Sequence, residues 1–240
     1  MNLAGKHVLI TGGVRRIGRS LALGVIRAGG TVSIHTAHSI DEGQLLLAEL
    51  HQHKQAYLVQ ADLSDPSQAA ELVQRACLHG PLDALVNNAA IFEDLAWNNT
   101  ELDSWQRTLN INLTAPFLLS QAFARQISTG RTGRIINILD WRALRPGADH
   151  LPYTISKAGL AALTQALAVA LAPNIQVNGI ALGAILPPAD GSDTARIVEN
   201  VPAQRWSTLE EVVETLLFLL GGPEFITGEI IHVDGGRHLV

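Results

Sequence analysis

Thr11-Gly-Gly-Val-Arg-Arg-Ile-Gly18 is the stretch that decides the fold. It follows an apolar run, His7–Thr11, typical of a buried strand, and leads into an amphipathic segment, Val14–Ala28, typical of a helix. Gly12 allows a sharp turn, and Gly18 allows the helix to pack close to the strand. The first N–H groups and the dipole of such a helix favour a phosphate.

The rest of the chain repeats this alternation of short apolar runs and longer amphipathic ones. The expected strands are His7–Thr11, Thr31–His35, Ala56–Ala61, Ala84–Asn87, Arg134–Leu139, Gln176–Ala181 and Glu229–Val233. The expected helices are Val14–Ala28, Asp41–His53, Pro66–His79, Leu102–Gln126, Tyr153–Leu171 and Leu209–Leu220. We therefore expect an α/β fold, a single-domain, Rossmann-like, doubly wound parallel sheet of about seven strands with helices on both faces, over residues 1–240.

The composition excludes several classes of protein. With 47% hydrophobic and 16% charged residues, the chain is not disordered. One cysteine, Cys77, rules out an internal disulfide framework, and nine histidines without metal-ligand spacing predict no metal. The longest apolar tract, around Leu160–Ala172, is too short to span a bilayer, and the start lacks a targeting pattern. We expect a cytoplasmic protein that does not bind membranes.

The charge is distributed unevenly. The net charge of -5 argues against nucleic-acid binding. Residues 1–40 carry five basic side chains and no acidic one, so the rest of the chain carries -10. This pattern indicates a small anionic ligand near the N-terminus, with a solvated arginine face as the alternative.

The second expected strand suggests which dinucleotide is bound. A site that prefers NAD usually places an acid at the end of this strand, but here it ends Ile34-His-Thr-Ala-His-Ser39 and the first acid of the chain is Asp41. The side chains that would suit a 2′-phosphate instead are Arg15, Arg16, His35, His38 and Ser39. The sequence therefore predicts NADP(H) as the cofactor.

Tyr153-Thr-Ile-Ser-Lys157 opens another expected helix. Positions i and i+4 share one helical face, so Lys157 is expected near the phenol of Tyr153. A neighbouring ammonium lowers the pKa of a tyrosine from about 10 toward neutral pH, which suits a general acid or base.

Together, the motifs resemble the short-chain dehydrogenase/reductase family over essentially the whole chain. They are Thr11-Gly-x-x-x-x-x-Gly18, Asp62, Asn87-Asn88-Ala89, Asn112, Gly133-Arg-Ile-Ile-Asn137, Tyr153-x-x-x-Lys157, Val177-Asn178 and Val233-Asp-Gly-Gly236. The resemblance implies that Tyr153 donates a proton, that Lys157 lowers its pKa and holds the nicotinamide ribose, and that Asn112 holds a water in a proton relay.

The resemblance also implies a set of cofactor contacts, mostly through the backbone. Asp62 and Leu63 would face the adenine, Asn88 and Ala89 the adenosine side, and Gly183 to Ile185 the nicotinamide. Together with the residues of the first turn, of the second strand and of the Tyr153–Lys157 motif, they make up the expected cofactor site: Thr11, Gly12, Arg15, Arg16, Ile17, Gly18, His35, His38, Ser39, Asp62, Leu63, Asn88, Ala89, Tyr153, Lys157, Gly183 and Ile185.

Departures from the family pattern narrow the expected substrate. Arg16 replaces a glycine of the first turn, and Asp140 replaces the catalytic serine that precedes Tyr153 by thirteen residues. Ala90 replaces a glycine, and Leu182 replaces a proline without a functional interpretation.

The combination of Arg16 in the turn and Asp140 at the serine position is similar to the pattern of the pteridine reductases and dihydromonapterin reductases. In these enzymes an aromatic residue at the place of Phe92 stacks on the pterin. The expected substrate contacts are Arg16, Phe92, Asp140 and Tyr153. Trp141 either lines this pocket or covers it. The leading interpretation is an NADPH-dependent reductase of a pterin-type substrate, such as dihydrobiopterin, dihydromonapterin or a dihydrofolate-like compound.

Two other functions stay open at this stage. One is an NADPH-dependent reductase of a keto-acyl or sugar ketone, with Asp140 in the place of the serine. The other is a non-catalytic NADP-binding regulatory protein, against which the retention of Tyr153, Lys157 and Asn112 argues. In each case the segment Tyr153–Leu171, apolar nearly all round, is expected in a subunit interface of a homotetramer.

Overall fold

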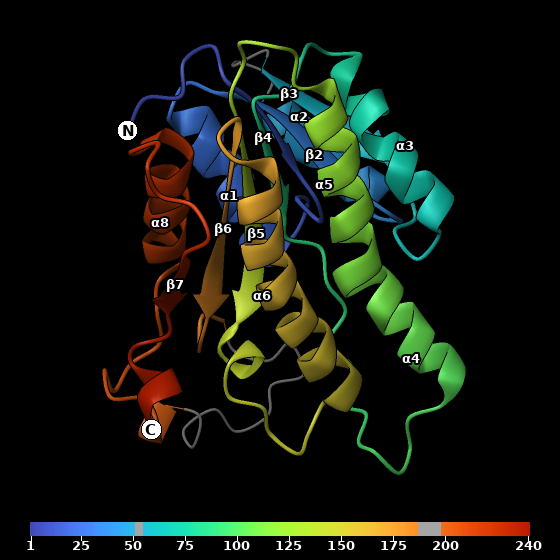
Figure 1. Ribbon diagram of the computed structural model, residues 1–240, viewed down its shortest axis with the longest axis vertical. Coiled ribbons are helices and arrows are strands. Elements are labelled where there is room, and N and C mark those ends of the chain that lie inside the picture. Colours follow the sequence, from blue (N-terminus) through green and yellow to red (C-terminus); the bar gives the residue numbers. More distant parts are fainter. Residues whose placement is uncertain (51–54, 187–197) are drawn as a thin grey trace.

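The structure is a computed structural model that describes residues 1–50, 55–186 and 198–240. One parallel sheet runs through it in the order β3-β2-β1-β4-β5-β6-β7 (Figure 1). The strands are β1 (His7–Ile10), β2 (Thr31–Thr36), β3 (Ala56–Gln60), β4 (Ala84–Asn87), β5 (Gly133–Asp140), β6 (Ile175–Leu182) and β7 (Ile230–Val233). The α-helices are α1 (Arg16–Arg27), α2 (Ile40–Glu49), α3 (Pro66–Cys77), α4 (Leu102–Leu109), α5 (Ala115–Gln126), α6 (Leu151–Leu171) and α8 (Leu209–Gly221).

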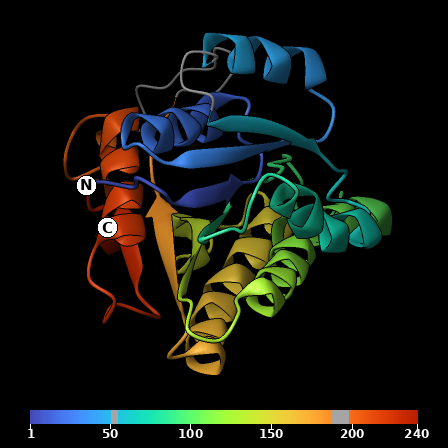
Figure 2. The same cartoon turned by 90° about the horizontal axis from the view of Figure 1, so that it is seen from above.

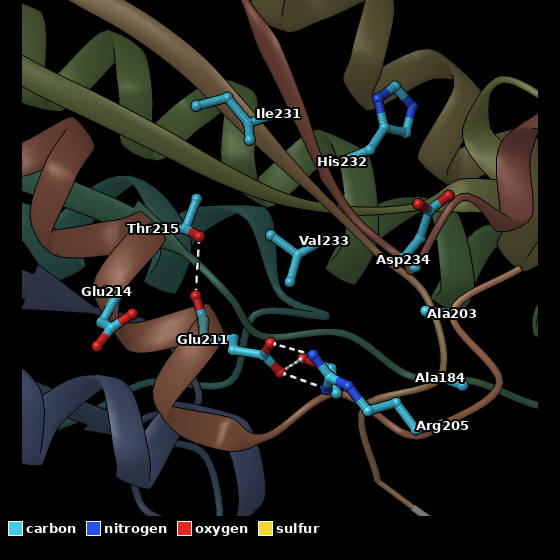
Figure 3. A pocket seen from close by; sticks show the side chains of 12 residues that line it. Ala184, Ala203, Arg205, Glu211, Glu214, Thr215, Ile231, His232, Val233 and Asp234 are labelled. Atoms are coloured by element: carbon cyan, nitrogen blue, oxygen red, sulfur yellow. Dashed lines mark hydrogen bonds and ion pairs between the residues drawn. The ribbon is translucent and has the colours of Figure 1, made fainter. Parts of the chain in front are cut away.

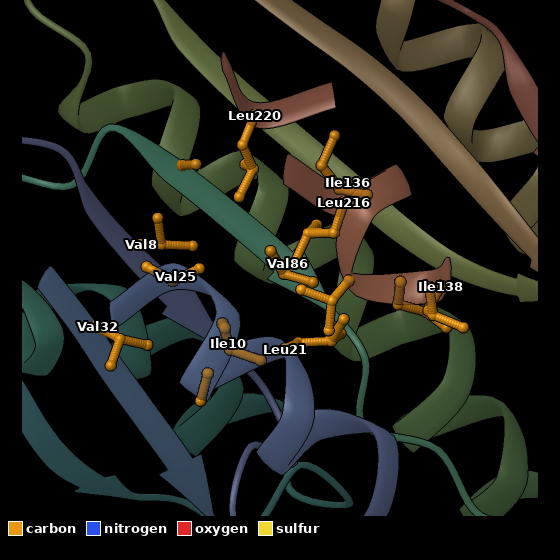
Figure 4. Packing of buried hydrophobic residues seen from close by; sticks show 14 of the residues in the cluster. Val8, Ile10, Leu21, Val25, Val32, Val86, Ile136, Ile138, Leu216 and Leu220 are labelled. Atoms are coloured by element: carbon orange, nitrogen blue, oxygen red, sulfur yellow. The ribbon is translucent and has the colours of Figure 1, made fainter. Parts of the chain in front are cut away.

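The sheet is covered on both faces, as the apolar strands require (Figure 2). Alternate side chains of β1 point to opposite faces. Val8 and Ile10 pack with residues of α1 and α8 (Figure 4), whereas Leu9 packs with residues of α3 and α5. All four residues of β1 are buried. The expected doubly wound α/β fold is confirmed.

The topology brings two motif segments together at one edge of the sheet. The chain winds outward from β1 to β3 and then returns, so that β4 pairs with the other side of β1. The turn after β1 and the segment after β4 are therefore neighbours at the carboxyl ends of these strands. Doubly wound sheets bind their ligands at this kind of reversal.

The expected helix Leu102–Gln126 is interrupted. A π-helical turn, η2 (Asn110–Thr114), separates α4 from α5, and the N–H of Ala115 donates to the carbonyl of Asn110. Pro116 explains the change, because it has no N–H for the carbonyl of Asn112, four residues earlier. π-turns of this kind are frequent at functional sites.

Helix α6 begins at Leu151, two residues before the expected start, and only part of it is buried. Its outer face exposes Ile155 (42%) and Val169 (83%). Among the described residues, α6 alone has the length and apolar composition of a membrane span, which is weak support for one because its inner face packs on the sheet. The end of the expected helix Asp41–His53 lies outside the described residues.

Candidate active site

The turn after β1 is held by the end of β4. The hydroxyl oxygen of Thr11 accepts hydrogen bonds from the N–H groups of Asn88 (2.9 Å) and Ala89 (3.0 Å). The side-chain amide of Asn88 donates to the carbonyls of Thr11 (2.8 Å) and Gly12 (3.1 Å). Gly12 has φ +61°, in the left-handed region that favours glycine. The two segments expected to hold the cofactor thus form one hydrogen-bonded unit.

The start of α1 has the features of a phosphate site. A Cβ on Gly18 would lie 2.1 Å from the carbonyl oxygen of Gly12 and 2.7 Å from Nδ2 of Asn88, so only glycine fits. The helix has Arg15 at its N-cap without a side-chain capping bond, and no acid in its first turn. Such an N-terminus directs N–H groups and a positive dipole at its ligand. The first turn, from Arg16 through Ile17 to Gly18, therefore fits the phosphates of a dinucleotide.

His35 has a different role from the one expected. Its side chain is buried, and Nε2 donates to the carbonyl of Ala61 (2.9 Å), which leaves Nδ1 to accept the N–H of Gly12 (3.0 Å). Burial lowers the pKa of His35 to about 4, so the ring is neutral at physiological pH. The expectation that this ring contacts a 2′-phosphate is corrected: both nitrogens are engaged, and His35 positions Gly12 instead.

The other residues expected at a 2′-phosphate surround the start of α2. Arg15 is exposed and forms an ion pair with Glu42 through its Nε and Nη2 atoms. His38 is exposed, and Ser39 stands at the N-cap of α2 without a side-chain capping bond. Arg16 is exposed as the first residue of α1, with φ +49°. Their contacts with a 2′-phosphate remain a prediction, and Glu42 is a competitor that sequence reasoning missed.

The residues expected near the adenine follow β3. The carboxylate of Asp62 accepts hydrogen bonds from the N–H (2.9 Å) and hydroxyl (2.8 Å) of Ser64, which lower the pKa of Asp62. Leu63 is buried in the core beneath them. These two residues therefore offer mainly backbone groups to a ligand.

The residues expected near the nicotinamide follow β6. Gly183 has no room for a side chain, because a Cβ would lie 2.6 Å from the Cα of Asp234. Ile185 is buried in the core cluster next to α1 and α8. Here too, the backbone is the group available to a cofactor.

The predicted catalytic side chains converge where β5 ends and α6 begins. The hydroxyl of Tyr153 donates to Oδ2 of Asp140 (3.1 Å), and the N–H of Arg142 donates to Oδ1 of the same carboxylate (2.9 Å). The ammonium of Lys157 is buried, donates to the carbonyl of Ile138 (2.7 Å) and lies 5.7 Å from the centre of the Tyr153 ring. The spacing of Tyr153 and Lys157 in the sequence thus places them as expected.

Their protonation differs from the expectation. Burial and then the charge of Asp140 raise the pKa of Tyr153 well above its usual value of 10. Burial also raises the pKa of Asp140 and lowers that of Lys157 to about 8. The pKa of Tyr153 is therefore raised and not lowered as expected, because the phenol is buried and, second, is in contact with the carboxyl group of Asp140. Tyr153 and Asp140 form a coupled pair that holds a transferable proton.

Asn112 lies in the π-turn with its side-chain amide fully used. Its Oδ1 accepts the N–H of Ile91 (2.9 Å), and its Nδ2 donates to the carbonyl of Ile91 (3.0 Å) and the hydroxyl of Ser156 (3.1 Å). The amide thus fixes the segment after β4 against α6. A water held by Asn112, as the family resemblance implies, would have to bond its backbone carbonyl.

Phe92 follows this fixed segment and lies against the reacting pair. Its ring is 55% exposed and meets Tyr153 edge to face, with 4.6 Å between ring centres. Phe92 also stacks on His150, with 4.0 Å between ring centres, and Nδ1 of His150 donates to the carbonyl of Glu93 (2.9 Å). Sequence reasoning missed His150, because a lone histidine before a helix carries no motif.

A cationic stack adjoins the site. The guanidinium of Arg237 lies 4.5 Å from the centre of the Trp141 ring. That of Arg142 lies 5.0 Å from Trp141 and 5.9 Å from Phe92, and it donates to Asp149 (2.8 Å). Sequence reasoning left the role of Trp141 open and did not find its two arginine partners, one of which comes from the distant C-terminus.

A cavity of about 370 Å³ lies beside this region, between β7 and the start of α8 (Figure 3). Ala184, Val233 and Asp234 line it, and so do Arg205 and Glu211, which form an ion pair (2.6 Å). None of the predicted catalytic side chains is part of its lining, so the reaction is not assigned to it.

The fold agrees with the comparison to known proteins. The short chain dehydrogenase family matches residues 6–197. The chain belongs to this family. Among curated family members, 5-keto-D-gluconate 5-reductase of Escherichia coli is 33% identical over 248 aligned residues, covering 98% of this chain and 96% of that protein. The 3-oxoacyl-[acyl-carrier-protein] reductase FabG of Aquifex aeolicus is 35% identical, covering 98% of each.

Solved structures of the family show the same architecture. FolM alternative dihydrofolate reductase 1 from Brucella canis, solved with NADP, has a TM-score of 0.92 and 35% identity, covering 100% of this chain and 97% of that one. A short chain dehydrogenase from Burkholderia cenocepacia, also with NADP, has a TM-score of 0.92 and 34% identity, covering 99% of each. As a short-chain dehydrogenase, the chain is an oxidoreductase.

Proposed function

We propose that this short-chain dehydrogenase is an NADPH-dependent reductase of a dihydropterin-type substrate. The single observation that carries the proposal is the Asp140–Tyr153 hydrogen bond (3.1 Å) with Phe92 against it. The phenol of Tyr153 donates a hydrogen bond to the carboxyl group of Asp140 beside an exposed aromatic ring. A flat heteroaromatic substrate with ring N–H groups suits this arrangement, because it stacks on Phe92 and bonds to both oxygen atoms.

The cofactor assignment rests on the first turn. The uncapped helix N-terminus suits the cofactor phosphates, and Arg15 and Arg16 suit a 2′-phosphate where the chain has no acid before Asp41. Lys157, whose ammonium is buried beside Tyr153, would hold the ribose next to the nicotinamide. The NADP bound by related structures supports this choice. When bound, the reduced cofactor supplies the hydride.

The chain's own residues then manage the proton. The substrate's ring nitrogen needs a proton when the adjacent carbon gains a hydride. Tyr153, whose pKa lies above its usual value of 10, is protonated at neutral pH and can deliver that proton. Asp140 either accepts an N–H of the substrate or re-protonates the phenol, which explains why a carboxyl group replaces the serine hydroxyl of the family. Asn112 keeps the segment that leads to Phe92 in place.

NADPH oxidation with a substrate panel tests the proposal. The panel contains dihydrobiopterin, dihydromonapterin, dihydrofolate, a keto-ester and 5-keto-gluconate. We expect turnover with at least one dihydropterin, and a loss of at least about tenfold in its kcat/KM in Asp140→Ser, or about 1.4 kcal/mol. Undiminished pterin turnover in Asp140→Ser, or ketone turnover far above that of every pterin, would overturn the assignment.

A carbonyl reductase is the second candidate. The observation in its favour is the similarity to the 5-keto-D-gluconate and 3-oxoacyl reductases, at 33% and 35% identity. In this case protonated Asp140 would donate to the substrate carbonyl as a serine does. Asp140→Ser would then retain or increase ketone reduction, which separates the two functions.

The assembly and location follow from the same features. The exposed apolar face of α6, which includes Ile155 and Val169, supports a homotetramer in which a second subunit covers it. The chain is proposed to act in the cytoplasm on a small molecule, without nucleic-acid, membrane or metal partners.

A further inference from the structure

The guanidinium of Arg237 has no hydrogen-bonded partner in the described part of the chain. It opens the short C-terminal helix η4 (Arg237–Leu239), which lies beside η3 (Trp141–Ala143) at the carboxyl end of the sheet (Figure 1). Its guanidinium is partly buried over the Trp141 ring, at 4.5 Å from the ring centre. No ion pair or hydrogen bond of this side chain occurs among residues 1–50, 55–186 and 198–240.

The carboxylates nearest to Arg237 are already bonded elsewhere. Those that act on its charge are Asp140, Asp149 and Asp234. Asp140 accepts from Tyr153 and from the backbone of Arg142, and Asp149 accepts from the side chain of Arg142. Asp234 accepts three hydrogen bonds, from the N–H of Gly236 and from the N–H and Nδ1 of His238. Arg237 thus carries a positive charge that these acids do not neutralise by contact.

Arg142 extends the cationic surface toward the reacting pair. Its Nη2 donates to Asp149 (2.8 Å), but its buried Nε has no hydrogen-bond partner in the described residues. An unsatisfied buried donor of a charged group costs stability unless a ligand supplies an acceptor. Its guanidinium lies over both Trp141 and Phe92, the ring that contacts Tyr153. The two arginines therefore continue the aromatic wall of the active site.

The stacking also sets the direction of the donors. A guanidinium that lies over an aromatic ring keeps its N–H groups in its own plane, pointing away from the ring edge. A carboxylate or phosphate can then accept two parallel hydrogen bonds from the same fork. A neutral hydroxyl gains much less from such a charged fork.

We infer that Arg237, held on Trp141 beside Asp140 and supported by Arg142, forms a subsite for an oxyanion on the side chain of the substrate. The inference rests on the proposed function, since it takes the reacting ring to be a dihydropterin bound between Phe92 and the cofactor. It adds the substrate class: a dihydropterin whose side chain ends in a carboxylate or a phosphate. The ring binds at Tyr153, and the charged end reaches the guanidinium of Arg237.

Steady-state kinetics with three dihydropterins test the subsite. Dihydrobiopterin has a neutral side chain, dihydrofolate carries carboxylates, and dihydroneopterin monophosphate carries a phosphate. In Arg237→Gln, we expect the KM of the preferred anionic substrate to rise about tenfold more than that of dihydrobiopterin, equivalent to about 1.4 kcal/mol. Arg237→Lys keeps the positive charge but lacks the two parallel donors of a guanidinium, so its KM for the anionic substrate should lie between those of the wild type and Arg237→Gln. The anion with the larger KM effect identifies carboxylate or phosphate as the ligand.

Arg145→Gln is the matched control. Arg145 is exposed in the same region and carries the same charge, and within the described residues its side chain donates to the backbone carbonyl of Arg237 (3.4 Å) and to no carboxylate. This variant should change the KM values of anionic and neutral pterins by similar factors. Equal KM changes for all three substrates in Arg237→Gln would overturn the subsite, as would equal effects of the two Gln variants.

Calorimetric titration separates this inference from the proposed function. p-Aminobenzoylglutamate and inorganic phosphate are titrated into the NADP-saturated protein, so no turnover is needed. Weaker binding of one of them in Arg237→Gln, or in Arg237→Lys if Gln does not fold, supports the subsite even if no pterin is reduced. Unchanged binding of both in a folded variant rejects the subsite, whereas pterin turnover by the wild type would still support the proposed function.

Discussion

Replacing His35 by glutamine tests whether a buried neutral ring supports the glycine turn. The ring accepts the N–H of Gly12 (3.0 Å) and donates to the carbonyl of Ala61 (2.9 Å). Glutamine has a donor and an acceptor but cannot place both where the two ring nitrogens lie. Leaving one buried backbone group unsatisfied costs about 1–3 kcal/mol. We expect His35→Gln to unfold at lower denaturant and to bind NADPH more weakly, because Gly12 shifts.

The contribution of His35 to the free energy of unfolding also depends on pH, and its size follows from the pKa of the ring. Burial lowers the pKa of His35 from 6.5 in the unfolded chain to about 4 in the fold. Between these values the unfolded state binds more protons, so this group's contribution is complete above pH 6.5 and is lost as the pH falls toward 4. The difference amounts to about 3 kcal/mol, of which about 2 kcal/mol is lost between about pH 7 and about pH 5.

The assay is urea unfolding across this pH range for the wild type, His35→Gln and the control His38→Gln. Other titrating groups contribute in all three proteins, so the difference from the wild type isolates one histidine. His35→Gln should lose about 2 kcal/mol less than the wild type on acidification, whereas His38→Gln, at an exposed position, should follow the wild type. If His35→Gln and the wild type lose the same free energy, His35 is not held neutral by burial and the reasoning is refuted.

Three further changes have defined outcomes. Glu42→Gln releases Arg15 from its ion pair, so the Kd for NADPH should fall while that for NADH stays nearly constant in fluorescence titrations; parallel changes would exclude Arg15 from the 2′-phosphate site. Gly18→Ala places a Cβ 2.1 Å from the carbonyl oxygen of Gly12 and should raise the Kd for NADPH at least about tenfold. A folded variant with the wild-type Kd would contradict this expectation. Val169→Glu places a charge on the exposed face of α6 and should reduce the mass from light scattering toward the single-chain value of 25.7 kDa. A variant with the same oligomeric mass as the wild type would place the interface elsewhere.

The strands, the helices and the convergence of motifs could be predicted because they depend on local patterns. The continuous apolar run of β1 predicts a strand buried between two helical layers, and the i, i+4 spacing predicts that Lys157 lies beside Tyr153. The glycine turn and Asn88 meet because parallel strands present their carboxyl ends at one edge.

The rest depends on contacts between distant segments. The sequence predicts a contact between His35 and a 2′-phosphate, yet the side chain is buried and bonds to Gly12 and Ala61. The lysine four residues after Tyr153 predicts a lowered pKa for the phenol, but burial and then contact with Asp140, from another element, raise it. Arg237 meets Trp141 only in the fold.

The π-turn before α5 has a consequence for the tolerance of the chain to deletions. A five-residue turn holds one amino acid more than ordinary helical winding needs, and each residue of a helix advances its direction by about 100°. Deleting one residue within Asn110–Thr114 would remove this extra residue and turn α4 by about 100° relative to α5, while Pro116 would still lack the N–H that a continuous α-helix needs. The amide of Asn112 would then move away from Ile91 and Ser156, and the segment before Phe92 would lose the hydrogen bonds that hold it against α6. The extra residue of the π-turn therefore sets the rotation of α4 relative to α5, and with it the direction of the Asn112 side chain.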